Sequence, residues 1–286
     1  MRGAADIPCE DRRGSPFERL LTKARDLGLK VIIDLFQDHI HQKTQPENLP
    51  FIERLRAPTD SYDNRAMVGK ISAGHRARQV IGDHTRGSNR LHMAYSFDML
   101  GPKFSPQHFR DTVTAFFDAA PDGWPAGAFS NHDTMRHLSR WSEHGPPDAL
   151  ARLSAALLLS LEGSAYIYQG EELGQIETDL SFDELRDPPG ITSWPDCKGR
   201  DGCRTPMVWD GSAQGGFTTG TPWLPVKPPH LARNLAGQGD GSILTFYRQI
   251  LTFPSPPLTP PRISEGLTPD GKLHPLGFAL LPLQPA

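Results

Sequence analysis

The strongest constraint on the fold is a helix pattern that runs directly into an apolar strand near the start of the chain. Ser15-Pro16-Phe17-Glu18 has the pattern of a capped helix start, and Gly28 is typical of a helix end. The run 29–36 is almost entirely apolar. Such runs are typical of parallel strands, because helices bury both faces of a parallel sheet. The segment therefore predicts a helix–strand unit of an α/β protein.

The same alternation of helix and strand continues along the chain. Short apolar runs predict further strands near 66–71, 92–97, 126–130 and 165–169. Between them, helical patterns cover 49–62, 106–117 and 149–161. Pro58 is expected to break or shorten the first of these helices. Because helical crossovers join parallel strands, we expect the strands, including 30–36, to lie parallel and adjacent.

The later part of the chain has a different character. Residues 174–241 show little regular pattern, and 243–251 predicts a last short helix. Proline is frequent from there to the end, which favours a poorly ordered tail. We therefore expect one domain over 15–250 and a proline-rich tail over 251–286.

Composition excludes several classes of protein. A net charge of −3 over 286 residues implies no nucleic-acid partner. The cysteines Cys9, Cys197 and Cys203 are too few for a disulfide framework, and their spacing suits no common zinc site, so no metal and no cofactor are expected. No apolar run is long enough to span a membrane, and the start of the chain does not resemble a signal peptide, which favours a cytoplasmic location.

A polar triplet, Asn131-His132-Asp133, follows the predicted strand 126–130. In α/β barrels the carboxyl end of a strand is where the chemistry is done. The triplet suits a sugar, because histidine donates to a hydroxyl and aspartate accepts from two more. Taken alone, it is better explained as a polar loop.

Several segments together resemble the bacterial α-glucosidases of the α-amylase superfamily, which includes the oligo-1,6-glucosidases. The unit ending in Asp34 and His39 is similar to the third barrel strand of that family. Four later segments resemble its fifth to eighth strands, in this order: 67–70, 91–98, 129–133 and 167–172. A last segment, 199–210, resembles the loop after the barrel. The resemblance covers about 15–42 and 47–250. It implies an α/β fold, an incomplete (β/α)8 barrel of the TIM type that lacks the first, second and fourth strands.

The resemblance also implies roles for individual residues. Asp133 takes the place of the carboxylate that stabilises the transition state, and Asp34, His39 and His132 take the places of residues that hold the terminal glucose. Arg204 is expected to reach the same pocket from the long loop.

Neither of the two reacting carboxylates is found. The family has a glutamate as general acid where this chain has Lys70, and the short motif that carries the nucleophilic aspartate is absent. Asp60 and Asp63 are better explained by a loop, Glu171 and Glu172 by a turn, and His92 by packing. We expect the Lys70 ammonium to pair with Asp133 in the mouth of the barrel.

The resemblance therefore predicts an α-glucosidase-type glycoside hydrolase that acts on short α-linked glucosides such as maltose or isomaltose. The residues predict an inactive copy, with exposed apolar surface and a tendency to self-associate. The alternative is a non-catalytic protein of the same fold that binds sugar or another protein. A transferase or isomerase of the superfamily would need the same missing carboxylates.

Overall fold

A computed structural model describes residues 22–28, 48–63, 65–71 and 76–252, and the backbone of the strands at 263–267 and 273–280. The chain divides into two compact units, 1–43 and 44–286. In the first unit a helical stretch ends at Gly28, whose φ of 69° lies in the left-handed region typical of helix ends. The predicted strand 30–36 lies outside the described residues, as does the predicted helix start.

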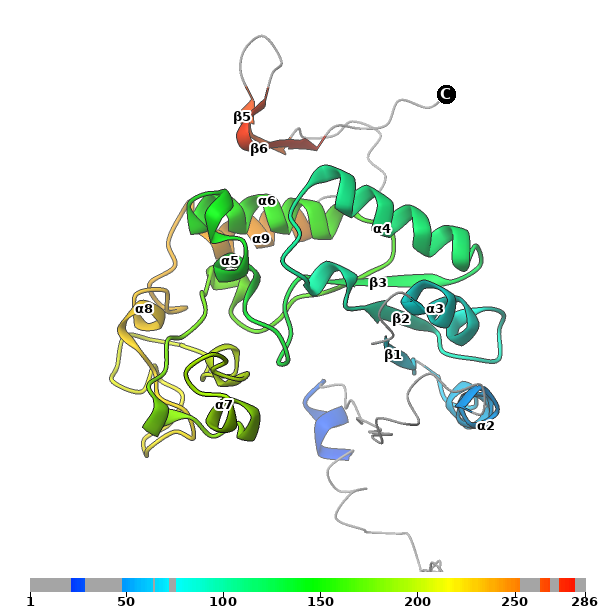
Figure 1. Cartoon of the computed structure of the whole chain (residues 1–286), viewed down its shortest axis with the longest axis horizontal. Coiled ribbons are helices and arrows are strands. Elements are labelled where there is room, and N and C mark those ends of the chain that lie inside the picture. Colours follow the sequence, from blue (N-terminus) through cyan, green and yellow to red (C-terminus); the bar gives the residue numbers. More distant parts are fainter. Residues whose placement is uncertain are drawn as a thin grey trace, which may run out of the picture. The chain divides into compact units, whose positions relative to one another are not determined.

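The second unit contains a sheet of four short parallel strands. These are β1 (Val68–Ile71), β2 (Met93–Ser96), β3 (Trp124–Ala128) and β4 (Ser164–Tyr166), paired in the order β1-β2-β3-β4. The predicted parallel and adjacent arrangement is confirmed for these four strands (Figure 1). Helical segments connect them, as expected for β/α units.

The helices of this unit begin and end close to the predicted limits. They are α2 (Asn48–Asp60), α4 (Pro106–Ala119), α6 (Pro147–Ser160) and α9 (Ile243–Leu251). Pro58 lies in the last turn of α2, and the helix ends two residues after it. At the start of α4, the Ser105 hydroxyl accepts a hydrogen bond from His108 N at 3.1 Å, and Pro106 occupies the first turn. None of the described helices combines the length and apolar character needed to cross a bilayer.

One further helix, α3 (Ala77–Thr85), has no counterpart in the sequence analysis. It contains Gly82, which lowers helix propensity. Packing stabilises it instead, because Val80 and Ile81 are buried against the sheet residues Ile71 and Ala94. A Cβ atom at Gly82 would lie 2.5 Å from Ala119 O of α4, so glycine is needed where the two helices approach.

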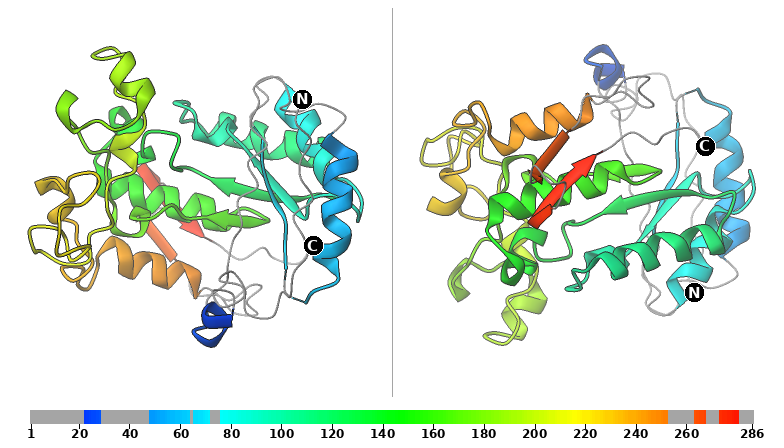
Figure 2. Two further views of the ribbon diagram at one scale, coloured as in Figure 1. Left: turned by 90° about the horizontal axis from the view of Figure 1, so that it is seen from below. Right: turned by 90° about the horizontal axis from the view of Figure 1, so that it is seen from above.

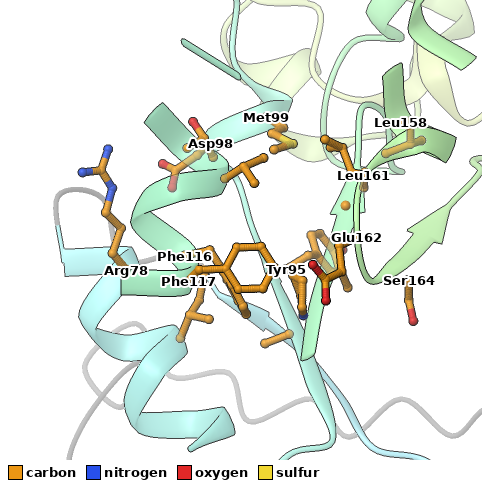
Figure 3. Close-up of a pocket in the computed structure, with 18 residues that line it drawn as sticks. Arg78, Tyr95, Asp98, Met99, Phe116, Phe117, Leu158, Leu161, Glu162 and Ser164 are labelled. Atoms are coloured by element: carbon orange, nitrogen blue, oxygen red, sulfur yellow. The ribbon is translucent and has the colours of Figure 1, made fainter. Parts of the chain in front are cut away.

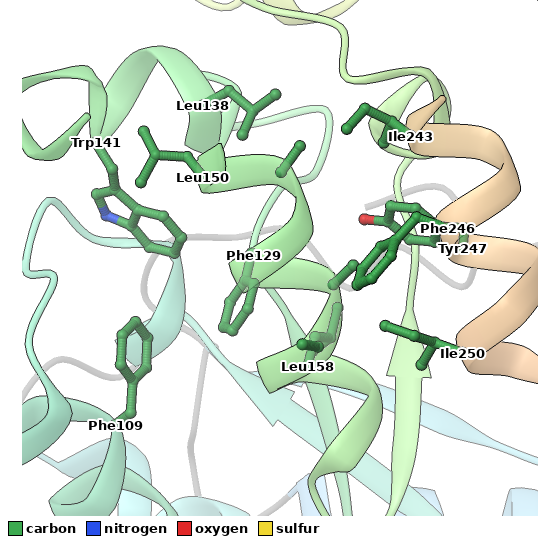
Figure 4. Close-up of a cluster of buried hydrophobic side chains, with 13 residues drawn as sticks. Phe109, Phe129, Leu138, Trp141, Leu150, Leu158, Ile243, Phe246, Tyr247 and Ile250 are labelled. Carbon is green, nitrogen blue, oxygen red and sulfur yellow. The ribbon is translucent and has the colours of Figure 1, made fainter. Parts of the chain in front are cut away.

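The main core lies around α6 (Figure 4). Phe129 and Trp141 stack edge to face, with ring centroids 5.3 Å apart. α9 packs beside α6 (Figure 2). Its buried side chains recur at helical spacing and are Ile243, Phe246, Tyr247 and Ile250.

The region after β4 consists of turns and short helices, as predicted. Among them are η4 (Glu171–Leu173), α7 (Pro188–Thr192), η6 (Asp201–Cys203) and α8 (Pro228–Leu231). Within the predicted proline-rich tail, the described segments β5 (Ile263–Leu267) and β6 (Leu273–Leu280) pair antiparallel.

Candidate functional site

The polar triplet leaves β3 in a turn that its own side chains stabilise. Asn131 Oδ1 accepts hydrogen bonds from Asp133 N at 2.9 Å and from the Thr134 hydroxyl at 3.1 Å. Side-chain oxygens of asparagine commonly close such turns two residues on. The Ser130 hydroxyl accepts from His137 N at 2.9 Å, which fixes the turn to α5 (His137–Arg140). The backbone that carries Asp133 is therefore held from both sides.

Two arginines, the partly buried Arg140 and the buried Arg136, bind this turn to its neighbours. Arg140 Nη2 donates to Phe129 O at 2.5 Å. Arg136 is 1% exposed, and it donates from Nη1 to Gln169 O at 2.7 Å and from Nη2 to Cys203 O at 3.2 Å. Arg136 thus joins the end of β3, the end of β4 and the loop 199–210.

Asp133 is the centre of a cationic group. Lys70 Nζ of β1 lies 2.5 Å from Asp133 Oδ2, and His132 Nε2 lies 3.5 Å from the same oxygen. Arg200 Nη1 and Arg204 Nη2 lie 3.2 Å and 3.3 Å from Asp133 Oδ1. The predicted contact between Lys70 and Asp133 is confirmed, and Arg204 approaches the carboxylate as expected.

Burial raises the pKa of Asp133, but the hydrogen bond and charge of Lys70 outweigh burial, and the charge of His132 and the hydrogen bond from Arg200 add to the effect. The net result is a pKa below the usual range for aspartate. Asp133 is therefore ionised at neutral pH, and its carboxylate accepts hydrogen bonds through both oxygens.

Arg200 is itself held by a second carboxylate, Asp187. Arg200 Nη2 donates to Asp187 Oδ1 at 2.7 Å, and Nε donates to Oδ2 at 3.0 Å. The hydrogen bonds from Arg200 lower the pKa of Asp187, although burial opposes them. Sequence reasoning missed this pair. Arg200 lies in the stretch 199–210 that resembles the family, whereas Asp187 lies in a segment with no recognisable motif.

Glu171 lies at the start of η4 and is almost fully buried. Its Oε1 is 3.7 Å from His137 Nδ1, and no described residue donates a hydrogen bond to either carboxyl oxygen. Burial raises the pKa of Glu171 to about 8 and lowers the pKa of His137 to about 3. At neutral pH the Glu171 carboxyl and the His137 imidazole are therefore both mainly neutral.

The remaining candidates of the sequence analysis lie elsewhere. Asp34 and His39 are outside the described residues. Asp60 belongs to α2, where it pairs with Arg56 at 2.7 Å and with His92 Nε2 at 3.3 Å. His92 also accepts a hydrogen bond from Met67 N through Nδ1 at 3.0 Å, which is a structural role. In the part of the chain that the structure describes, Asp187 is the only further carboxylate that shares a cation with Asp133. The same part holds no cluster of three or more metal-ligating side chains.

Figure 3 shows a pocket of this unit and the side chains that line it. Its lining includes Phe116 and Phe117 of α4, Tyr95 of β2, and Leu161 and Glu162 after α6. Neither Asp133 nor any of the cations around it lines the pocket. We attribute the pocket to a packing gap between α4, α6 and the sheet, and we place the candidate site at Asp133.

Comparison with known proteins identifies the family of the chain. A family model described as the catalytic domain of alpha amylase matches residues 37–253. A probable alpha-glucosidase from Rhizobium meliloti (strain 1021) is 47% identical over 222 residues, which cover 76% of this chain and 40% of that protein. An oligo-1,6-glucosidase from Heyndrickxia coagulans is 36% identical over 156 residues, which cover 47% of this chain and 28% of that protein.

Solved structures show the same relationship in three dimensions. The crystal structure of an alpha-glucosyl transfer enzyme, XgtA, superposes with a TM-score of 0.68 at 45% identity. The superposition covers 72% of this chain and 39% of that enzyme. The matched part of this chain therefore spans less than half the length of these relatives.

Proposed function

This chain belongs to the α-amylase catalytic-domain family, and from that premise we propose that it binds the terminal glucose of short α-linked glucosides at Asp133 without hydrolysing them. The described sheet has four parallel strands, the structural neighbours are (β/α)8 barrel glycoside hydrolases of this family, and the relatives include α-glucosidases. Maltose and isomaltose are the proposed ligands. A cytoplasmic location stays a prediction from the sequence.

Support for binding comes from the groups that converge on one carboxylate. Asp133, His132 and Arg204 occupy neighbouring positions, and Arg204 Nε donates to His132 O at 2.7 Å. An ionised carboxylate accepts hydrogen bonds from sugar hydroxyls, and the imidazole and guanidinium donate to sugar oxygens. Asp34 and His39 are proposed as further ligands of the same glucose, on the strength of the family resemblance alone.

The proposed absence of hydrolysis rests on the contact of Lys70 with Asp133. Retaining hydrolysis needs two carboxyl groups on either side of the scissile bond, one as nucleophile and one as acid. Here an ammonium group occupies the position next to Asp133, at 2.5 Å. Because an ammonium differs from a carboxylic acid in charge, shape and pKa, Lys70 does not replace the general acid.

The proposal is tested by calorimetric titration with maltose and by hydrolysis of p-nitrophenyl α-glucoside. We expect weak binding by the parent, with a Kd on the order of 1 mM. Asp133→Asn should abolish the heat, because it removes the accepting carboxylate. The control, Asp122→Asn, changes an exposed aspartate in the turn after α4 and should bind as the parent does.

The hydrolysis assay should give the buffer rate for the parent and for Lys70→Glu, because the variant restores an acid but supplies no nucleophile. Turnover by the parent would reveal a working pair of carboxylates. Turnover by Lys70→Glu alone would show that another aspartate reaches the anomeric carbon. Equal heats for the parent and Asp133→Asn would remove the site from consideration.

A further inference from the structure

The charges around Asp133 do not balance. The group defined by direct contact contains three full cations, Lys70, Arg200 and Arg204, and two carboxylates, Asp133 and Asp187. It therefore carries one excess positive charge, and a second when His132 is protonated. Lys70 creates this excess, because a glutamate at the same position would give the group a net negative charge.

The carboxylates of this group are also less exposed to solvent than its cations. The carboxylates are the covered members, with side chains 20% exposed for Asp133 and 1% for Asp187. The cations are more open, with side chains 29% exposed for Arg204, 35% for Lys70 and 40% for Arg200. A molecule that approaches from solvent meets the ammonium and guanidinium groups first.

The hydrogen-bonding groups around Asp133 also favour an anionic ligand over a neutral one. Asp133 Oδ2 already accepts from Lys70, and Oδ1 accepts from Arg200 and Arg204. The hydroxyls of a neutral sugar must compete with these donors for the carboxylate. A ligand with its own anionic oxygens accepts from Lys70 and Arg204 directly, and such charge-assisted hydrogen bonds are the stronger kind.

We propose that this group binds a sugar that carries a phosphate group in preference to the neutral glucoside. The inference rests on the proposed function, because the sugar occupies the same site and only its chemical class is refined. The glucosyl hydroxyls contact Asp133 and His132, and the phosphate oxygens accept from Lys70 and Arg204. The preference follows from Lys70 and is absent from a site with an acid at that position.

The experiment compares four ligands by calorimetric titration of the full chain: maltose, glucose 1-phosphate, glucose 6-phosphate and inorganic phosphate. We expect one of the two sugar phosphates to bind about tenfold more tightly than maltose, because hydrogen bonds to charged groups exceed neutral ones by that order. Inorganic phosphate should bind more weakly than that sugar phosphate. Raising the salt concentration from about 0.05 M to about 0.5 M should weaken binding of the sugar phosphate and leave maltose binding in place.

Lys70→Gln is expected to act in opposite directions on the two ligand classes. It should weaken binding of the sugar phosphate by about tenfold. It should strengthen maltose binding, because a neutral amide competes less strongly than the ammonium for Asp133 Oδ2. Lys103→Gln changes an exposed lysine outside the group and serves as the matched control. If Lys70→Gln does not fold, Arg204→Gln and the salt dependence of the parent provide the comparison between sugar phosphate and maltose binding.

The outcomes separate the two proposals. Maltose binding as tight as that of the tighter-binding sugar phosphate would overturn the preference and leave the proposed function intact. Inorganic phosphate binding as tight as the sugar phosphates would also overturn it, because the group would then recognise an anion without a sugar. Absence of heat with every ligand would overturn both proposals.

Discussion

At the scale of single residues, Glu171 has the most unusual environment. It is buried beside His137 and receives no hydrogen bond from the described residues. The raised pKa of about 8 means that the folded state retains a proton that the unfolded state has lost. The contribution of Glu171 to the free energy of unfolding should therefore fall as the pH rises from about 4.5 to about 8.

Glu171→Gln removes this titration while keeping a similar shape. We expect equal free energies of unfolding for the parent and the variant near pH 4.5, and a more stable variant near pH 8. Since one pKa unit corresponds to about 1.4 kcal/mol, the gain is on the order of a few kcal/mol. Urea unfolding across this pH range measures it, with the exposed Glu143→Gln as control. A difference between parent and variant that stays constant with pH would contradict this account.

At the scale of elements, the core depends on the docking of α9 onto α6. The two helices contact each other, and the apolar face of α9 joins the cluster that contains Phe129 and Trp141. α9 is only nine residues long, which is too short to be stable as an isolated helix. Its stability must therefore come from this packing.

Two neighbouring residues at the end of α9 test this dependence. Ile250 is buried in the cluster, whereas Leu251 is exposed. Ile250→Ala should lower the free energy of unfolding by about 2 to 5 kcal/mol, the usual range for buried large-to-small changes. Leu251→Ala should change it by less than about 0.5 kcal/mol. Similar losses for both variants in chemical denaturation would mean that α9 does not dock as described.

The elements also show how far sequence reasoning reaches. The strands β1 to β4 were predictable, because each lies in a short apolar run between helical patterns. The contact of Lys70 with Asp133 was predictable from the family resemblance, which places the two residues on strands that face one barrel mouth. α3 was not, because packing against the sheet outweighs its weak propensity. The pair of Arg200 and Asp187 joins two irregular segments. No periodicity connects such segments, so only the folded path of the loops brings them together.

At the scale of the whole molecule, one face of the sheet carries exposed apolar side chains. The strand register aligns Val68 with Met93 and Met93 with Trp124, so these side chains form a row across three strands. Val68 and Trp124 are both exposed. Within the described residues β1 also has a strand partner on one side only, and such edges promote association between chains.

We therefore predict that the protein self-associates through this row. Sedimentation velocity should show an average mass that rises with protein concentration, and Val68→Lys should reduce the rise, because a charge on an edge strand opposes pairing. Phe217→Lys changes an exposed aromatic residue in the loop region and should leave the association unaltered. A single monomeric species at every concentration would contradict this prediction.

The two described cysteine thiols differ in their access to oxidants, and one of them belongs to the loop that Arg136 binds. Cys203, whose carbonyl accepts from Arg136, is buried, and burial raises the pKa of its thiol to about 12. Cys197, six residues earlier, is exposed. Because the thiolate is the form that oxidants attack, damage begins at Cys197, where solvent has access, and spares Cys203 as long as the loop stays closed. We therefore expect that oxidation of Cys197 leaves the contacts of Arg200 and Arg204 with Asp133 intact.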